Sequence, residues 1–150
     1  MMIDDPVMAR VTAAVTTLQQ GDPAAARKEF TALWAELDDD PLYRCVLAHY
    51  AADAEDEPAA SLRWNQRALD AVREVTDERA RELHDTLDVR AFAPSLHLNL
   101  AEDHRRLGDL DRARDHLREA KAAEHLLADD GYGALIRSGI TRMTEQLAPH

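Results

Sequence analysis

Apolar residues recur every three or four positions along most of this chain, which is the spacing of one face of an α-helix. The clearest example is the stripe of Ile136, Ile140, Met143 and Leu147 near the end of the sequence. The spacing predicts seven helices, near residues 4–20, 23–37, 41–54, 58–75, 94–107, 110–127 and 132–147. We expect residues 77–92 to form a short extra helix followed by a loop. No β-branched run has the length of a strand, so the pattern indicates an all-α fold.

Proline and glycine mark the ends of these segments. Asp22-Pro23, Asp40-Pro41 and Glu57-Pro58 each place an acid and a proline before an Ala/Leu-rich run, and Pro94-Ser95 opens a later one. Proline fits the first helical turn, and an acid there can accept hydrogen bonds from free backbone N–H groups and complements the helix dipole. Each pair therefore predicts a helix start. Glycines at 21, 108 and 131 are placed to supply stops and turns.

The net charge of the chain limits the classes of molecule that are expected to bind it. The chain has 150 residues, a net charge of −11, and no basic run longer than Arg105-Arg106. Nucleic-acid-binding proteins normally carry a basic stripe, and anionic membranes repel an acidic protein, so neither is expected as a partner. A basic protein partner is compatible with this charge. The sequence also lacks a phosphate loop, a nucleophile elbow and a zinc-protease helix, so we expect no enzyme activity and no cofactor.

The cysteine content and the first ten residues indicate in which cellular compartment the protein is expected. The only cysteine, Cys45, excludes an intrachain disulfide and favours a reducing compartment. Residues 1–10 include Asp4, Asp5 and Pro6 where a signal peptide would have an apolar core, and no apolar run has the length of a membrane span. We therefore expect a cytoplasmic location. Arginine outnumbers lysine sixteen to two, which favours a GC-rich, bacterial genome.

Part of the sequence repeats. The block that begins at Gly21, GDPAAARKEFTAL, returns 35 positions later as DEPAASLRWNQRAL, and a third copy, GDLDRARDHLREA, begins at Gly108. The interval from Asp56 to Gly108 exceeds a repeat of about 34 residues by about 18, and residues 77–92 account for the excess. Small residues recur at corresponding sites, where they let two helices touch.

These copies resemble the tetratricopeptide repeat, a helical hairpin with a Gly-Asp turn. The third copy fits best, with Leu100-Ala101, Gly108-Asp109 and then Ala113, Leu117 and Ala120; His104 stands where an aromatic residue is usual. The resemblance implies one domain over 1–150, with repeats near 7–37, 41–75 and 94–127, an insertion at 77–92 and a capping helix at 132–147. It also implies a right-handed superhelical stack of three hairpins.

In that family the first helix of each hairpin lines a concave groove. The resemblance therefore implies that a ligand contacts the first helix of each of the three repeats, with two further residues at the rim of the groove. The residues are Ser95, Leu98, Asn99, Glu102, Arg105 and Arg106 in the third repeat, Tyr43, Val46, Tyr50 and Asp53 in the second, Met8, Val11, Val15 and Leu18 in the first, and Tyr132 and Arg137 at the rim. Of these, the residues expected to bind a partner are Tyr43, Tyr50, Asn99, Glu102, Arg105, Arg106, Tyr132 and Arg137. The alternative for the two consecutive arginines is pairing with Glu102 or Asp109 in solvent. The alternative for the segment around Tyr132 is a turn capped by Asp130.

Other residues invite chemistry and have simpler interpretations. His97 and His104 lie seven residues apart on one face, and His49 could approach them from another helix, but no metal-ligand spacing accompanies them. We expect packed core histidines, and no metal. Cys45 is expected to be a buried thiol. Trp34 and Trp64 are expected in the core, although exposure of both would indicate a convex interface.

The resemblance implies a non-catalytic module that holds a peptide or helix of a partner protein in its groove, with the 77–92 insertion beside the groove as a possible gate. The alternative is a module that self-associates, dimerising through a convex or terminal helical face. A His-lined small-molecule pocket would require His49, His97 and His104 to converge.

Overall fold

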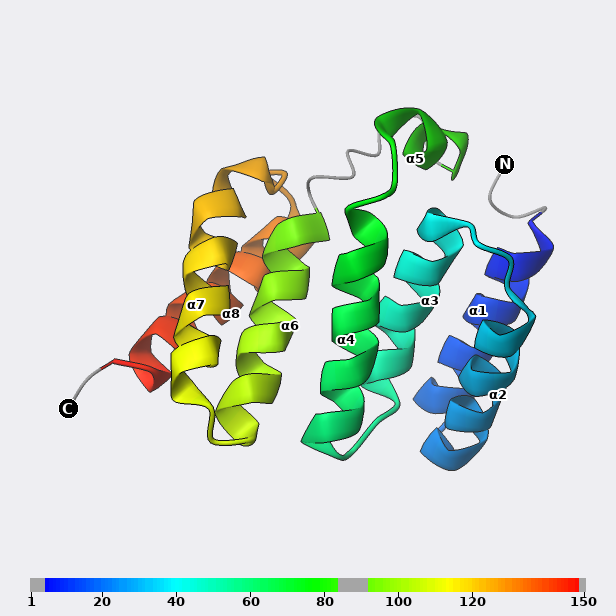
Figure 1. Cartoon of the computed structure of the whole chain (residues 1–150), viewed down its shortest axis with the longest axis horizontal. Helices are drawn as coiled ribbons and strands as arrows, with labels where there is room; N and C mark the ends of the chain where they lie inside the picture. The colour runs from blue at the N-terminus through cyan, green and yellow to red at the C-terminus, as the bar shows by residue number, and fades with distance from the viewer. Residues whose placement is uncertain (1–4, 84–91, 149–150) are drawn as a thin grey trace. The chain divides into compact units, whose positions relative to one another are not determined.

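The computed structural model describes residues 5–83 and 92–148, and every regular element within them is helical (Figure 1). The helices group into two compact units. The first contains α1 (Pro6–Gln19), α2 (Pro23–Glu36), α3 (Pro41–Asp53), α4 (Pro58–Val72) and the short α5 (Asp77–Leu83). The second contains α6 (Phe92–Arg106), α7 (Leu110–Ala123), a 3₁₀ turn (Glu124–Leu126) and α8 (Gly131–Gln146).

The prediction of an all-α fold is confirmed, and the predicted helices agree closely with the observed ones. The extra helix expected in the insertion is α5; the loop expected after it lies outside the described residues. The predicted helix at 94–107 begins earlier, at Phe92, so that Pro94 occupies its first turn. The predicted helix at 110–127 ends at Ala123 and continues as the 3₁₀ turn.

Acid–proline pairs begin four of the helices. The side chain of Asp22 accepts a hydrogen bond from Ala25 N (3.1 Å), and that of Asp40 accepts one from Leu42 N (3.0 Å). Asp5, before Pro6, does the same for Val7 N. Glu57 makes no such bond, because glutamate is one methylene longer than the preferred capping residues. The expected side-chain cap at Glu57 is therefore absent, although the helix still begins at Pro58.

In the first unit, α1 packs on α2 and α3 packs on α4 as two helical hairpins. The core is built on large side chains that are almost fully buried, among them Val11, Phe30, Leu42 and Leu47. Fully buried alanines stand among them and let the helices approach. Cys45 is buried in this core, as expected.

In the second unit, α6 and α7 form a third hairpin and α8 packs against both. The buried residues shared by the three helices are Ala101, Ala113, Leu117, Ala120, Leu127, Ile136, Ile140, Met143 and Leu147. The predicted stripe of α8 therefore faces this core. Leu98 of α6 packs at its edge against Gly139, where an added Cβ would lie 2.6 Å from Leu98 Cδ2.

Candidate functional site

The turn between α6 and α7 is set by two residues. Gly108 has a φ of +82°, a conformation that costs other residues energy, and Asp109 caps α7 by accepting from Arg112 N (3.2 Å). Ala101 and Ala113 lie on either side of the turn and are fully buried, so the helices meet closely there. The hairpin thus buries one face of α6 and leaves a polar face along the same helix.

Four of the predicted binding residues lie on α6: Asn99, Glu102, Arg105 and Arg106. Arg105 donates to both carboxylate oxygens of Glu102, at 2.6 Å from Nη2 and 3.0 Å from Nε. The two side chains remain 33% and 37% exposed, and Arg106 is exposed. The hydrogen bond to Glu102 is the largest cause of a raised pKa at Arg105. The structure therefore brings Glu102 and Arg105 together as the solvent-exposed pair that was the alternative interpretation.

The two residues expected at the rim lie on α8 and have different environments. Tyr132 is 50% exposed and follows Asp130, which caps α8 by accepting from Gly133 N (2.7 Å). Arg137 instead donates to the backbone oxygens of Leu127 (3.0 Å) and Ala128 (3.3 Å). Arg137 thus ties α8 to the preceding turn, a role that sequence reasoning did not identify.

Tyr43 and Tyr50 lie on α3, in the first unit. The hydroxyl of Tyr43 donates to Asp5, and the guanidinium of Arg79 from α5 lies over its ring, 5.0 Å from the ring centre. Arg79 also binds Asp40 through Nη2 (2.6 Å) and Nε (3.1 Å). Tyr43 is therefore covered by α5, whereas Tyr50 is 39% exposed and its ring lies beside that of His49.

Several residues expected to line the groove are instead core residues. Met8 and Val11 are buried, because the apolar face of α1 is the face that packs against its neighbours. Ser95 is also buried and donates to the backbone oxygen of Phe92 (3.1 Å). The apolar stripe of a helix is the stripe that folding buries, so it is a poor guide to a binding surface.

The tryptophans form an edge-to-face pair in the first unit, with ring centres 5.4 Å apart. Trp64 is buried and its Nε1 donates to Glu55 (3.3 Å), whereas Trp34 is half-buried. Arg67 lies over both rings and Arg44 lies over Trp34. The core position expected for Trp64 is confirmed, while Trp34 lies at the surface end of a cation–π stack.

Three histidines gather in the second unit, and one of them was missed. His97 of α6 and His116 of α7 face each other through their Nδ1 atoms, 3.0 Å apart. His104 is buried and stacks on His116, with ring centres 5.4 Å apart and planes 6° from parallel. His116 could have been found from the hairpin register, because an antiparallel pairing that aligns Ala101 with Ala113 brings 97 opposite 117, next to 116. His49 belongs to the first unit.

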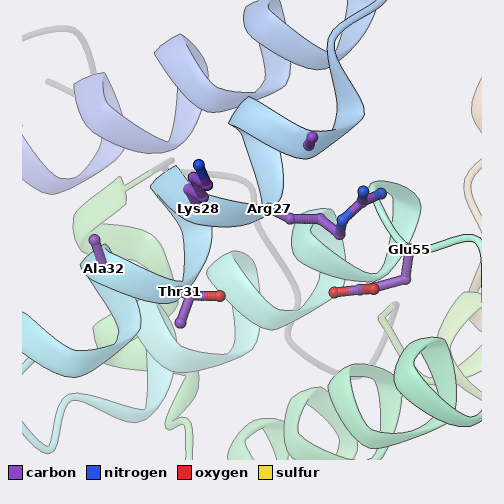
Figure 2. A pocket seen from close by; sticks show the side chains of 6 residues that line it. Arg27, Lys28, Thr31, Ala32 and Glu55 are labelled. Carbon is purple, nitrogen blue, oxygen red and sulfur yellow. The ribbon is translucent and has the colours of Figure 1, made fainter.

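A shallow hollow in the first unit lies between α2 and the turn after α3 (Figure 2). Its lining residues are Ala24, Arg27, Lys28, Thr31, Ala32 and Glu55. Figure 2 shows Arg27 reaching toward the turn that carries Glu55, and its Nη1 donates to the backbone oxygen of Ala54 (2.9 Å). This hydrogen bond ties α2 to the turn after α3 across the hollow.

A model of the tetratricopeptide repeat family matches residues 94–119, which span most of α6 and the first part of α7. No curated protein and no solved structure gives a significant match to the chain. Among the described residues, no helix is both long and apolar enough to cross a membrane. The matched residues are those of the copy that fits the repeat pattern best. Over these residues the α6–α7 hairpin is therefore similar to a tetratricopeptide repeat.

Proposed function

We propose that this protein is a non-catalytic interaction module that holds an extended peptide or a helix of a partner protein on the exposed faces of its first helices. The observation that carries the proposal is the family match to the α6–α7 hairpin. Tetratricopeptide repeats generally mediate protein–protein contacts and generally do not catalyse reactions. The polar face of α6 is the part of the proposed surface that the matched hairpin supplies.

The ion pair between Glu102 and Arg105 could be replaced by an ion pair between Arg105 and a ligand. Both side chains are about one-third exposed, and ion pairs in such positions contribute only about 0–1 kcal/mol. A carboxylate from a partner could therefore replace Glu102 on Arg105 at small cost and gain a two-point, charge-assisted contact. Arg106 and Asn99 would extend this contact along the helix.

On α3 the proposed surface is partly covered by the insertion. Arg79 of α5 lies over Tyr43 and binds Asp40, so α5 occupies a position that a partner would need in order to reach Tyr43. Tyr50, two helical turns further along α3, stays exposed. In this proposal α5 acts as a gate, and its release would expose Tyr43 to a partner.

The test is affinity capture from a lysate of the source cell with the double variant Arg105→Glu, Arg106→Glu. A matched control, Arg112→Glu with Arg118→Glu, makes the same change of charge on exposed residues of α7. We expect wild type and control to retain a partner that the α6 variant loses, while circular dichroism shows all three folded. Equal retention by all three would contradict the proposed surface.

A second candidate is self-association through α8. Tyr132 and Leu135 lie three residues apart on one helix and are 50% and 64% exposed. Residues three apart on a helix are neighbours, so these two side chains could pack against the same side chains of a second copy. Light scattering would show a dimer in wild type and a monomer for Leu135→Glu. A monomeric wild type at concentrations of about 100 μM would exclude a stable dimer.

A further inference from the structure

The head-to-head contact between His97 and His116 is unusual among the side-chain contacts of the second unit. Their Nδ1 atoms are 3.0 Å apart and their ring centres are 5.3 Å apart. Because each Nδ1 lies about 1.1–1.2 Å from its own ring centre, these two distances mean that the nitrogens point almost directly at one another. One Nδ1 carries a hydrogen and donates it to the lone pair of the other Nδ1.

We propose that His97 and His116 form a binding site for a divalent first-row transition-metal ion, which takes the place of the hydrogen between the two Nδ1 atoms. That proton moves to Nε2 of its own ring or to solvent, so that both Nδ1 lone pairs face the ion. This inference is independent of the interaction surface proposed above. Neutral imidazole is a common ligand of Zn²⁺, Cu²⁺ and Ni²⁺. The site was not expected from the sequence, where the metal hypothesis grouped His97 with His49 and His104.

The observed geometry is close to that of a metal site. A tetrahedral Zn²⁺ with Zn–N bonds of about 2.0–2.1 Å separates two ligand nitrogens by about 3.3–3.4 Å and holds the ring centres roughly 5.2 Å apart. The ring centres are already 5.3 Å apart. Binding therefore requires the two rings to swing until their nitrogens separate by a few tenths of an ångström, with no movement of α6 or α7.

The surroundings restrict the rings. His116 is stacked on the buried ring of His104, and His97 and His116 come from two helices that meet through fully buried alanines. Such preorganisation lowers the entropic cost of binding. The two imidazoles would supply two of the ion's ligands. We therefore expect a dissociation constant in the micromolar range.

The first test is a calorimetric titration of the intact chain with Zn²⁺, with Mg²⁺ as a hard ion that imidazole should not bind. We expect wild type to bind zinc at one site. The zinc affinity of both His97→Gln and His116→Gln should fall by more than the roughly 10–100-fold that follows loss of an outer-shell partner. His125→Gln changes an exposed histidine of the same unit and should keep the site. Absence of zinc binding in wild type, or unchanged binding in both variants, would overturn the proposal.

The second test uses wild type and does not depend on whether the variants fold. Imidazole nitrogen resonances recorded by NMR should shift on addition of Zn²⁺ for the Nδ1 atoms of His97 and His116, and not for those of His125. Shifts confined to other histidines would place the zinc elsewhere and would also overturn the proposal.

Discussion

At the scale of single residues, His49 is the group whose burial most directly predicts a pH effect. Its Nδ1 is buried with no hydrogen-bond partner among the described residues, and desolvation lowers its pKa below 6.5, against a smaller opposing effect of Asp53. The unfolded chain therefore binds a proton more readily than the folded protein. Stability should be fully present above about pH 6.5 and should fall as the pH decreases below it.

Urea unfolding at pH 7.5 and pH 5.5 checks this prediction. Wild type should lose free energy of unfolding at the lower pH, and His49→Gln should lose less. Burial raises the pKa of Asp53, which acts in the opposite direction, because the folded protein takes up that proton more readily than the unfolded chain as the pH falls. An equal loss in wild type and variant would assign the effect to other groups.

The thiol of Cys45 provides a second residue-scale prediction. Burial raises its pKa from 9.0 to about 12, so the thiolate is scarce at pH 8. Labelling by a disulfide reagent should be at least about a hundredfold slower in the folded protein than in urea. The contribution of the buried thiol to the free energy of unfolding is present below pH 9 and is lost as the pH rises further. Fast labelling of the native protein would mean that α3 opens readily.

At the scale of elements, the start of α8 depends on a close approach that the sequence did not reveal. The string Asp129-Asp130-Gly131-Tyr132-Gly133 predicted a capped turn, and the cap is observed. The periodicity did not show that Gly133 lies against Ala128 O, where an added Cβ would overlap that oxygen. Local patterns predict where a helix begins, whereas such a contact depends on how the chain returns in space.

Gly133→Ala should therefore destabilise the second unit, by about 1–3 kcal/mol, because the backbone at Ala128 must shift. Gly131→Ala is the matched control: nothing lies within 4 Å of a Cβ there, so its effect should be small or stabilising. Chemical denaturation of both variants measures the difference. Similar unfolding free energies would show that the turn adjusts without strain.

The side chain of Arg79 joins the short helix α5 to α3. Seven residues are too few for a stable isolated helix, and Arg79 joins α5 to α3 through Asp40 and Tyr43. Arg79→Gln should increase amide hydrogen exchange in α5 by roughly tenfold or more and leave α3 protected. Arg81→Gln changes an exposed arginine of the same helix and should have little effect. Unchanged exchange in Arg79→Gln would remove the basis for the proposed gate.

At the scale of the whole molecule, the periodicity of apolar residues was sufficient to predict the helices and insufficient to predict which residues lie at the surface. Apolar spacing located the seven helices that it predicted, because burial of one face is what makes a helix stable in water. The same logic misassigned Met8 and Val11, since an apolar stripe assigned to a groove is the stripe that the core takes. It also missed the His97–His116 contact, because pairing across a hairpin requires the register of two helices.

Net charge gives the prediction that belongs to the molecule as a whole. The 29 acidic and 18 basic residues leave a net charge of −11, so the excess acidic side chains repel one another in the folded protein. Screening by salt weakens this long-range repulsion, while the ion pairs at the surface contribute little each. The thermal midpoint at pH 7.5 should therefore rise by a few degrees between 10 and 200 mM NaCl. Because repulsion grows with the square of the charge, Asp38→Asn with Asp129→Asn should make the rise about one-third smaller. A midpoint that falls with salt would mean instead that close ion pairs, such as Arg79–Asp40, outweigh the repulsion.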